Sequence, residues 1–389
     1  MESEDHMSTN ELTYGMVGGD VKAFIGDVHR KAIGFDPRCH LVAGAFSIDP
    51  VLHVLTADTY HIAKDRRYND YKEMAEAESK RKDKIDFVVI VTPNASHYQI
   101  SKEFLLHDIN VICEKPLCFT LEEANELSKI AKDRNLLFAV NYGYTGYTMV
   151  KIAKEMIAKK ELGKLLSVQI QYAQDWLIDT TDSTKSAEMG KKIWRLDPKA
   201  SGISCSLGDI GTHAENLFRY LTGDEIKRLV VSTDKYGQAL DLNSNVIIQC
   251  QDGLHVGIWV SQVAIGCENG LKFQIYGTKG SLNWNQQDPD TLYYGLLHEP
   301  QMKLVRGSNY LKKYEASSNS RLPSGHPEGL YEAFANNYRH IISYLIKKKG
   351  KEEPTLEDCD FPTIADGLDG VKFVHKAIQS ATEEKWLEY

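Results

Sequence analysis

The sequence predicts an α/β protein with two domains, on three observations. Strand-like and helix-like segments alternate from residue 12 to residue 140, which is typical of a doubly wound parallel sheet. Beyond about residue 165 strand-like runs follow one another with few helices between them, which indicates an α+β domain with a large, mostly antiparallel open sheet. The chain of 389 residues, 42% of them hydrophobic, is long enough for two cores.

The alternating part contains five expected strands. A continuous β-branched run at residues 87–91 has the pattern of a strand buried on both faces of a parallel sheet. The expected strands are residues 12–17, 41–46, 87–91, 110–113 and 136–140. The expected helices, which have helical periodicity, are residues 23–33, 71–82, 96–106 and 121–133.

The second part contains six expected strands and four expected helices. The strands are residues 166–172, 229–233, 246–250, 254–263, 271–276 and 280–284. The helices are residues 149–160, 210–221, 331–348 and 364–384. We therefore expect a disordered tail over residues 1–10, a nucleotide-binding domain over 11–144 and a substrate and oligomerisation domain over 145–389. We also expect the helix within residues 360–384 to pack back near the first domain.

The composition of the chain limits the classes of partner that it is expected to bind. Acidic residues outnumber basic ones, 54 to 46, so a nucleic-acid backbone has little to bind. The apolar run at 87–91 is far shorter than the roughly 20 residues that span a bilayer. The acidic start of the chain does not read as a secretory signal. Seven scattered cysteines show no zinc spacing and favour a reducing cytoplasm, and no metal site is expected.

Two polar clusters are the candidates for chemistry. Glu114-Lys115-Pro116 directly follows a buried strand, and a Gly-Asp-Ile-Gly-Thr-His run at residues 208–213 opens a helix. Asp209 and His213 are four residues apart, which places both on one face of a helix. The alternatives are that the first cluster only opens a surface loop and that His213 is a capping or buried structural histidine.

A glycine turn follows the first strand, where a pyrophosphate could rest on a helix N-terminus. The chain offers Gly18 and Gly19 but lacks the full Gly-x-Gly-x-x-Gly pattern. Ser47 ends the second strand, and the following Ile-Asp-Pro supplies a carboxylate, Asp49, but no cation for a 2′-phosphate. We therefore predict NAD as the cofactor, with NADP as the alternative.

These residues together resemble the Gfo/Idh/MocA family, named for glucose-fructose oxidoreductase, inositol dehydrogenase and a rhizopine catabolism protein. The resemblance rests on Thr92-Pro93-Asn94 with His97, on Glu114-Lys115-Pro116, and on Asp209 with His213. It covers nearly the whole chain. Segments at 23–26 with 29–30, 144–147, 194–195 with 197–198, and 326–329 are similar to the branch with levoglucosan dehydrogenase and glucoside 3-dehydrogenases.

The resemblance implies an N-terminal Rossmann domain that holds the nicotinamide, and a substrate that lies between this domain and the C-terminal sheet. It implies a dehydrogenase of a sugar, glycoside or inositol, acting on the C3 hydroxyl of a pyranoside, and a homodimer or homotetramer built on the exposed face of the sheet. The expected cofactor contacts are Gly18, Gly19, Phe24, Ile25, Ser47, Thr92, Pro93, Asn94, His97, Glu114 and Lys115. The expected substrate contacts are Tyr144, Trp176, Trp194, Arg195, Asp209, His213 and His326.

Oxidation of an alcohol needs a base, and Lys115 and His213 are the candidates. A lysine with an ordinary pKa is about 0.04% neutral at pH 7, a handicap of roughly 4.6 kcal/mol, whereas histidine has none. We therefore expect His213 to take or relay the proton, Lys115 to stabilise the oxyanion and Asp209 to bind a neighbouring hydroxyl. Lys115 as the base remains an alternative.

Other interpretations stay open at this point. Asn94 and His97 can be helix-start residues, because Asn caps helices well, and the aromatic residues can be ordinary core packing. Two other function classes also fit the sequence. One is an NAD-dependent glycosidase that works through transient C3 oxidation, and the other is a non-catalytic nucleotide-binding regulator.

Overall fold

A computed structural model describes residues 10–182 and 193–389. The predicted tail falls on residues 1–9, outside the described part, except for Asn10. The chain divides into two compact units, which we describe separately. The first unit contains the residues up to Cys118, Glu122–Gly143 and Leu330–Gly367, and the second contains Phe119–Leu121, Tyr144–Gly329 and Leu368–Tyr389.

The first unit is discontinuous in sequence. We expected the first domain to end at residue 144 and the remaining chain to form the second. The chain instead returns to the first unit with Leu330–Gly367, which contains helix α10 (Leu330–Lys349). Helix α10 packs against helix α1 (Phe24–Ile33) and strand β1 (Leu12–Gly18), because its apolar side chains face the core there.

The first unit has a five-stranded sheet in the order β2-β1-β3-β4-β5, and every pair in it is parallel. This confirms the predicted doubly wound sheet. The remaining strands are β2 (Cys39–Ala45), β3 (Phe87–Val91), β4 (Asn110–Cys113) and β5 (Phe138–Val140). The connecting helices are α2 (Pro50–Thr59), α3 (Tyr71–Ser79), α4 (His97–Leu106) and α5 (Leu121–Asp133). We did not predict α2, although Asp49 followed by proline is a helix-start signal.

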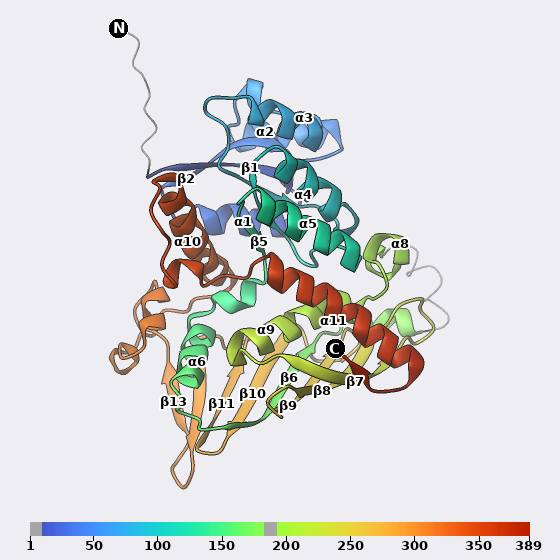
Figure 1. The fold of residues 1–389 in the computed structure, drawn as a ribbon, viewed down its shortest axis with the longest axis vertical. Coiled ribbons are helices and arrows are strands. Elements are labelled where there is room, and N and C mark those ends of the chain that lie inside the picture. The colour runs from blue at the N-terminus through green and yellow to red at the C-terminus, as the bar shows by residue number, and fades with distance from the viewer. Residues whose placement is uncertain (1–9, 183–192) are drawn as a thin grey trace. The chain divides into compact units, whose positions relative to one another are not determined.

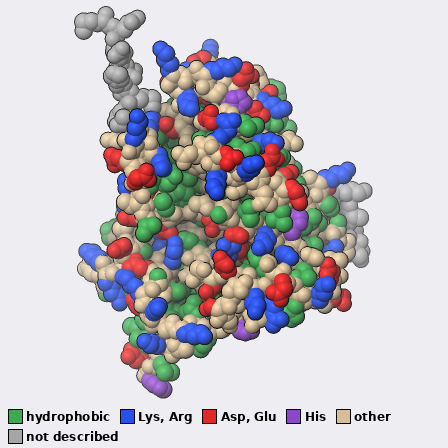
Figure 2. Space-filling model, in the orientation of Figure 1, with side chains coloured by type: hydrophobic (Ala, Val, Ile, Leu, Met, Phe, Trp, Pro, Cys, Tyr) green, Lys and Arg blue, Asp and Glu red, His purple; other side chains and the backbone are tan. Residues whose placement is uncertain are grey.

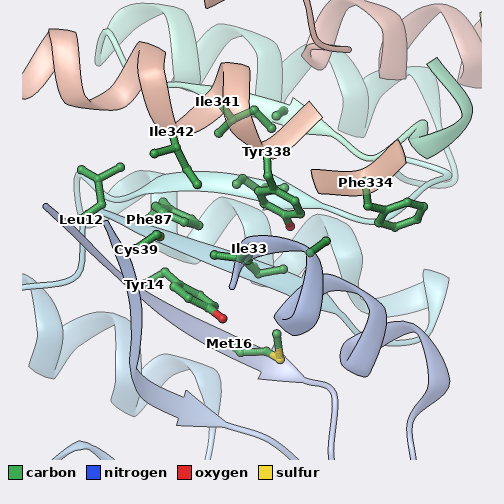
Figure 3. Close-up of a cluster of buried hydrophobic side chains, with 14 of the residues drawn as sticks. Leu12, Tyr14, Met16, Ile33, Cys39, Phe87, Phe334, Tyr338, Ile341 and Ile342 are labelled. Carbon is green, nitrogen blue, oxygen red and sulfur yellow. The ribbon is translucent and has the colours of Figure 1, made fainter. Parts of the chain in front are cut away.

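The core of the first unit joins residues from both ends of the chain (Figure 3). Tyr14 of β1 stacks on Phe87 of β3, with ring centroids 5.3 Å apart. Phe334, Tyr338 and Ile342 of α10 belong to the same buried cluster. The sheet therefore depends on a helix that lies about three hundred residues after its first strand.

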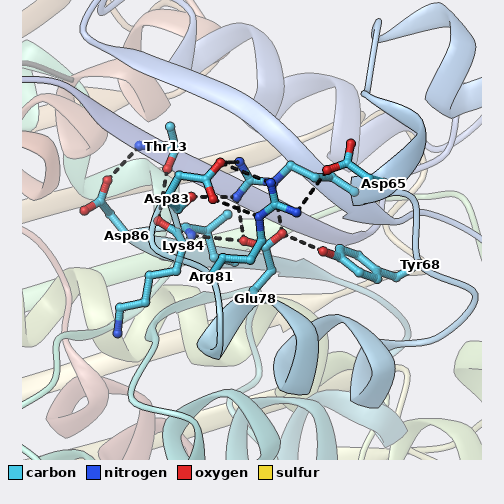
Figure 4. A network of polar contacts seen from close by, with 10 residues as sticks. Thr13, Asp65, Tyr68, Glu78, Arg81, Asp83, Lys84 and Asp86 are labelled. Carbon is cyan, nitrogen blue, oxygen red and sulfur yellow. Dashed lines mark hydrogen bonds and ion pairs between the residues drawn. The ribbon is translucent and has the colours of Figure 1, made fainter. Parts of the chain in front are cut away.

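Glu78 of α3 forms a buried ion pair with Arg66, and Figure 4 shows the polar network around Glu78. The Glu78 carboxylate, fully buried, accepts hydrogen bonds from Arg66 Nε at 3.0 Å and Nη2 at 2.5 Å. The Tyr68 hydroxyl at 2.8 Å and the Ile85 backbone N–H at 3.1 Å also donate to this carboxylate. Buried charges are tolerated when they are paired and hydrogen-bonded in this way.

The second unit contains a nine-stranded sheet in the order β13-β12-β11-β10-β6-β9-β8-β7-β14. All its pairs are antiparallel except β6 with β9, which confirms the predicted, mostly antiparallel sheet. The strands are β6 (Leu165–Ala173), β7 (Ile226–Asp234), β8 (Asn243–Cys250), β9 (His255–Ser261), β10 (Gly270–Gly277), β11 (Gly280–Asn285), β12 (Thr291–Leu296), β13 (Met302–Val305) and β14 (Leu387–Glu388). We did not predict the last three.

Helices α6 (Thr148–Ala158) and α9 (Thr212–Thr222) cover one face of the nine-stranded sheet (Figure 1). Alternate side chains of the strands are buried on one face of the sheet, as in β8, where Val246 and Ile248 are buried and Ile247 is exposed. The other helices are α8 (Pro198–Ser201) and α11 (Ile364–Glu383), which belongs to this unit from Leu368 onward. The opposite face of the sheet carries the exposed set of side chains.

Acidic and basic side chains are interspersed over the face shown in Figure 2, in keeping with the near balance of 54 acids and 46 bases. Within residues 10–182 and 193–389, no helix has both the length and the hydropathy to cross a membrane.

Candidate functional site

The glycine turn after β1 has the backbone that a nucleotide requires. Gly18 and Gly19 have φ of +79° and +73°, values that favour glycine. A Cβ on Gly26 would lie 2.3 Å from the Gly19 Cα, so α1 approaches the turn closely only because residue 26 is glycine. Ala23, at the N-cap of α1, has no side-chain oxygen to cap the helix. This helix end therefore fits a pyrophosphate.

The predicted flanking contacts lie at the same edge of the sheet. Phe24 opens α1 with 70% of its surface exposed, and Ile25 is partly buried against the core. Two residues after β2, Ser47 Oγ accepts a hydrogen bond from the Asp49 backbone N–H at 3.3 Å. The Asp49 carboxylate accepts from two backbone N–H groups of α2, so it caps this helix.

The His97 side chain forms hydrogen bonds to the backbone of two loops. Its imidazole has no exposed surface, and its Nδ1 and Nε2 lie 2.8 Å from the Pro116 carbonyl oxygen and 2.9 Å from the Thr92 carbonyl oxygen. Burial lowers the pKa of His97, although the two carbonyls oppose this. We expected a cofactor contact, but the side chain positions the loops that carry Thr92-Pro93-Asn94 and Lys115-Pro116. Pro93 itself is exposed, and Thr92 and Asn94 are half-buried.

Glu114 is held by protein donors. His29 Nε2 at 2.8 Å and Asn141 Nδ2 at 2.5 Å donate to its Oε1, and the Lys115 backbone N–H donates to its Oε2 at 3.1 Å. Burial raises the pKa of Glu114, but interactions with His29, Lys115 and Asn141 outweigh it and lower the pKa to about 2. The predicted cofactor residue is thus an ionised carboxylate that fixes the Lys115 loop.

In the second unit, Asp209 lies in a π-helical turn, Leu207–Gly211, that leads directly into α9. We expected a regular helix through residues 210–221. A π-turn adds a residue to the helical turn and often occurs at functional sites, because it redirects side chains. Asp209 and His213 are therefore presented by an irregular backbone at the start of α9.

Asp209 lies next to a cationic and aromatic group. Its Oδ2 accepts from Gln262 Nε2 at 2.9 Å and pairs with Arg195 Nε at 3.1 Å. The Arg195 guanidinium carbon lies 4.4 Å from the ring centroid of Trp194 and 5.7 Å from that of Trp176. Both tryptophans are exposed to about two fifths of their surface, 40% and 43%. Of the predicted substrate residues, Arg195 thus contacts Asp209, and Trp194 and Trp176 lie near Arg195.

His213 lies against two tyrosines. Its ring packs edge-on to Tyr144, with centroids 4.7 Å apart, and 6.0 Å from Tyr172. The two tyrosine hydroxyls are 2.5 Å apart, and the Tyr172 hydroxyl donates to Asn269 Oδ1 at 2.8 Å. Gln174 donates to the same oxygen and accepts from Trp176 Nε1. A continuous polar network therefore extends from Tyr144 to Trp176.

His326 is not joined to this group by any contact between described residues. Its imidazole is exposed, and its backbone carbonyl accepts a hydrogen bond from the buried Arg306. Arg306 also pairs with Asp290 and Glu328, so this arginine anchors the loop.

Several residues of these networks were not in the predicted site. They are His29, Asn141 and Tyr338 in the first unit, and Tyr172, Gln174, Gln262 and Asn269 in the second. The last three follow or precede strands β6, β9 and β10, which are neighbours only in the folded sheet. Their position directly beside the ends of these strands was the sequence signal that could have identified these polar residues.

The described residues contain no cluster of His, Cys, Asp or Glu that could hold a metal ion. What they do offer is a glycine turn that fits a dinucleotide, a fixed lysine loop and, in the other unit, an acid, an imidazole and hydroxyl groups beside exposed aromatic rings. Such groups can bind a polyol and move a proton.

Family profiles match two consecutive parts of the chain. The profile "Oxidoreductase family, NAD-binding Rossmann fold" matches residues 12–142, and the profile "GFO/IDH/MocA C-terminal domain" matches residues 150–283.

Similar proteins cover the whole chain. It is 31% identical to the uncharacterized oxidoreductase YfiI of Bacillus subtilis over 100% of both chains. It is 26% identical to levoglucosan dehydrogenase of Pseudarthrobacter phenanthrenivorans, over 97% of this chain and 98% of that one. A solved inositol dehydrogenase homologue complexed with NAD+ from Azotobacter vinelandii is 33% identical, with a TM-score of 0.89 and 97% of each chain covered. Its complex with NADH and myo-inositol has a TM-score of 0.88.

Proposed function

Because the chain belongs to the Gfo/Idh/MocA family of oxidoreductases, with an NAD-binding Rossmann domain, we propose that it oxidises a secondary alcohol of a sugar, glycoside or inositol. The family inferred from the sequence is confirmed. The observation that carries the proposal is the group in the second unit, where Asp209 and His213 lie among hydroxyls, amides and exposed tryptophans. Sugar rings present apolar faces to aromatic side chains and hydroxyls to polar ones.

The proposed roles follow from the chemistry of each side chain. The turn at Gly18 and Gly19 would hold NAD, which when bound would supply the hydride acceptor. His213 takes or relays the hydroxyl proton, because its ordinary pKa lies near neutrality. Lys115 stabilises the negative charge that develops on the substrate oxygen. Asp209, oriented by Gln262 and Arg195, binds a neighbouring hydroxyl. This proposal requires Lys115 and His213 to act on one substrate.

We propose the C3 hydroxyl of a pyranoside as the position oxidised, on the resemblance to the levoglucosan dehydrogenase branch. The pair Trp176 and Trp194 supports a ring-shaped substrate, because both tryptophans lie near Arg195 and expose part of their aromatic surface. Stacking on these rings would orient the sugar while Asp209 holds the hydroxyl next to the reacting carbon.

The test is direct. Purified protein is mixed with NAD and separate panels of glucosides, anhydrosugars, free sugars and inositols, while NADH absorbance is followed and products are identified by NMR. NADH formation with one class, and a 3-keto product from a pyranoside, are the expected results. Release of an aglycone without net NADH would instead identify a glycosidase. If no compound gave NADH or a new product, a nucleotide-binding regulator would be favoured.

The assigned residues have a matched test. His213→Ala and Lys115→Ala should each lower kcat by about 10²- to 10⁴-fold, the usual contribution of a positioned proton-transfer or oxyanion group. His255→Ala removes an exposed histidine of β9 and serves as the control. If either site variant kept kcat close to that of the wild type, its assigned role would be wrong.

The preference for NAD over NADP rests on the residues that follow β2. Ser47 and Asp49 supply no cation for a 2′-phosphate, and the Asp49 carboxylate at the start of α2 disfavours a second anion there. We expect a higher kcat/KM with NAD, and a clear preference for NADP would contradict this.

We also propose a homodimer or homotetramer formed through the open face of the nine-stranded sheet. This face presents Ile247, Tyr276 and Tyr293, all of them exposed large side chains. Light scattering after size exclusion measures the mass. Ile247→Lys should lower the mass, whereas a wild-type protein with the mass of one chain would refute the proposal.

A further inference from the structure

A buried row of polar side chains runs through the first unit and ends at Lys115. Tyr338 on α10, His29 on α1, and Glu114 and Asn141 after β4 and β5 are all buried. Polar groups are costly to bury unless each one has a partner. Four of them on separate elements therefore indicate a shared task.

The hydrogen bonds of this row are continuous. The Tyr338 hydroxyl lies 2.5 Å from His29 Nδ1, and His29 Nε2 lies 2.8 Å from Glu114 Oε1. Asn141 Nδ2 reaches the same carboxylate oxygen at 2.5 Å. The other oxygen of Glu114 accepts the Lys115 backbone N–H at 3.1 Å. A line of contacts thus joins α10 to the backbone of Lys115.

The hydrogen bonds of this row fit an arrangement in which Tyr338 donates to His29. Burial raises the pKa of Tyr338 well above its ordinary value, so the hydroxyl keeps its proton and can donate. An ionised carboxylate only accepts, so the nitrogen of His29 that faces Glu114 must carry a hydrogen. Donation from Tyr338 to Nδ1 leaves the ring hydrogen on Nε2, where Glu114 needs it. The tyrosine therefore selects the tautomer that orients the carboxylate.

We propose that Tyr338 and His29 are positioning residues for Lys115: they hold the Glu114 carboxylate in the orientation that fixes the Lys115 backbone and keeps a negative charge beside its side chain. This inference rests on the proposed function, in which Lys115 stabilises the substrate oxygen. Partners of this kind, one shell away from a reacting group, commonly change activity about 10- to 100-fold when removed at metal sites, and we expect a similar scale here.

The test compares three variants. His29→Leu removes both hydrogen bonds and should lower kcat about 10- to 100-fold, and His29→Gln, which keeps a donor toward Glu114, should recover part of the loss. Tyr338→Phe removes a single oxygen, stays foldable and should lower kcat severalfold. Tyr14→Phe removes a buried hydroxyl from the same core, outside the row, and is the control (Figure 3). The KM for substrate and the NADH dissociation constant should change less than twofold.

A second readout does not depend on turnover. Hydrogen exchange of the Lys115 amide should become faster in His29→Leu and Tyr338→Phe but not in Tyr14→Phe, because Glu114 would no longer be fixed as the acceptor. Unchanged exchange, or faster exchange with wild-type kcat, would overturn the inference. If the wild type itself forms no NADH with any substrate, the proposed function fails, and amide exchange alone decides whether the row positions Lys115.

Discussion

Replacement of Glu114 by Gln tests whether this buried carboxylate stabilises the first unit as an ion. The pKa of Glu114 falls from 4.5 to about 2 in the folded protein: burial raises it, but His29, Lys115 and Asn141 lower it more. Each unit of pKa corresponds to about 1.4 kcal/mol, so the ionised carboxylate contributes about 3 kcal/mol at neutral pH. Glu114→Gln cannot carry this charge and should lose a contribution of that order.

The pH dependence gives the sign of the effect. A carboxyl whose pKa is lower in the folded than in the unfolded state stabilises the protein above its unfolded pKa, and the contribution disappears as the pH falls through the folded pKa. The difference in stability between wild type and Glu114→Gln should therefore be constant from pH 7 to about pH 5.5. It should shrink by about 1.4 kcal/mol at pH 3.5, and continue to fall toward pH 2.

The assay must report on the first unit alone. All five tryptophans belong to the second unit, so their fluorescence follows that unit during urea unfolding. Hydrogen exchange of peptides from β3 and β4, measured at increasing urea concentration, reports the first. Glu357→Gln, at an exposed glutamate of the same unit, is the control. A wild-type-to-variant difference that is small, or that does not change between pH 7 and pH 3.5, would refute an ionised Glu114.

Three further outcomes follow from contacts described above. Glu78→Gln removes the buried counter-charge of Arg66, which then keeps only the exposed Asp83 at 3.4 Å, and should lower the free energy of unfolding by about 3 kcal/mol in urea titrations. Gly26→Ala forces a Cβ against the Gly19 Cα and should cost about 1–3 kcal/mol of stability and weaken NADH binding, as measured by fluorescence titration. Tyr172→Phe removes one bridging hydroxyl, worth about 0.5–1.5 kcal/mol, and should raise the KM for the polyol about 2- to 10-fold without changing that for NAD.

The sequence predicted most of the fold because the signals for it are local. The β-branched run of β3 and the alternation before it define a parallel sheet, and the strands of the second unit were found wherever apolar residues alternate. Strands β12 and β13 were not predicted, because tyrosine, lysine and glycine weaken the alternation of apolar and polar residues in them. The domain boundary in the structure differs from the predicted one. A helix shows the same periodicity whichever core it packs against, so the sequence of α10 did not indicate that it belongs to the first unit.

The candidate site was predictable only in part, for a related reason. Glu114 and Lys115 stand out because charges directly follow a buried strand. Their supporting residues do not, since Tyr338 and His29 are 309 residues apart in sequence. The π-turn at Asp209 was also missed, because helical periodicity does not distinguish one extra residue in a turn.

The first unit is assembled from segments far apart in the sequence, and this affects how it folds during synthesis. The apolar side chains of α10, including Phe334 and Ile342, complete a core whose other members are made near the start of translation. Until the ribosome has passed residue 349 and released that helix, β1 and β3 lack one of the layers that cover them. The first unit therefore exposes apolar surface during synthesis until the segment from Tyr144 to Gly329 and then α10 have been made. A protein truncated after Gly143 would keep that surface exposed.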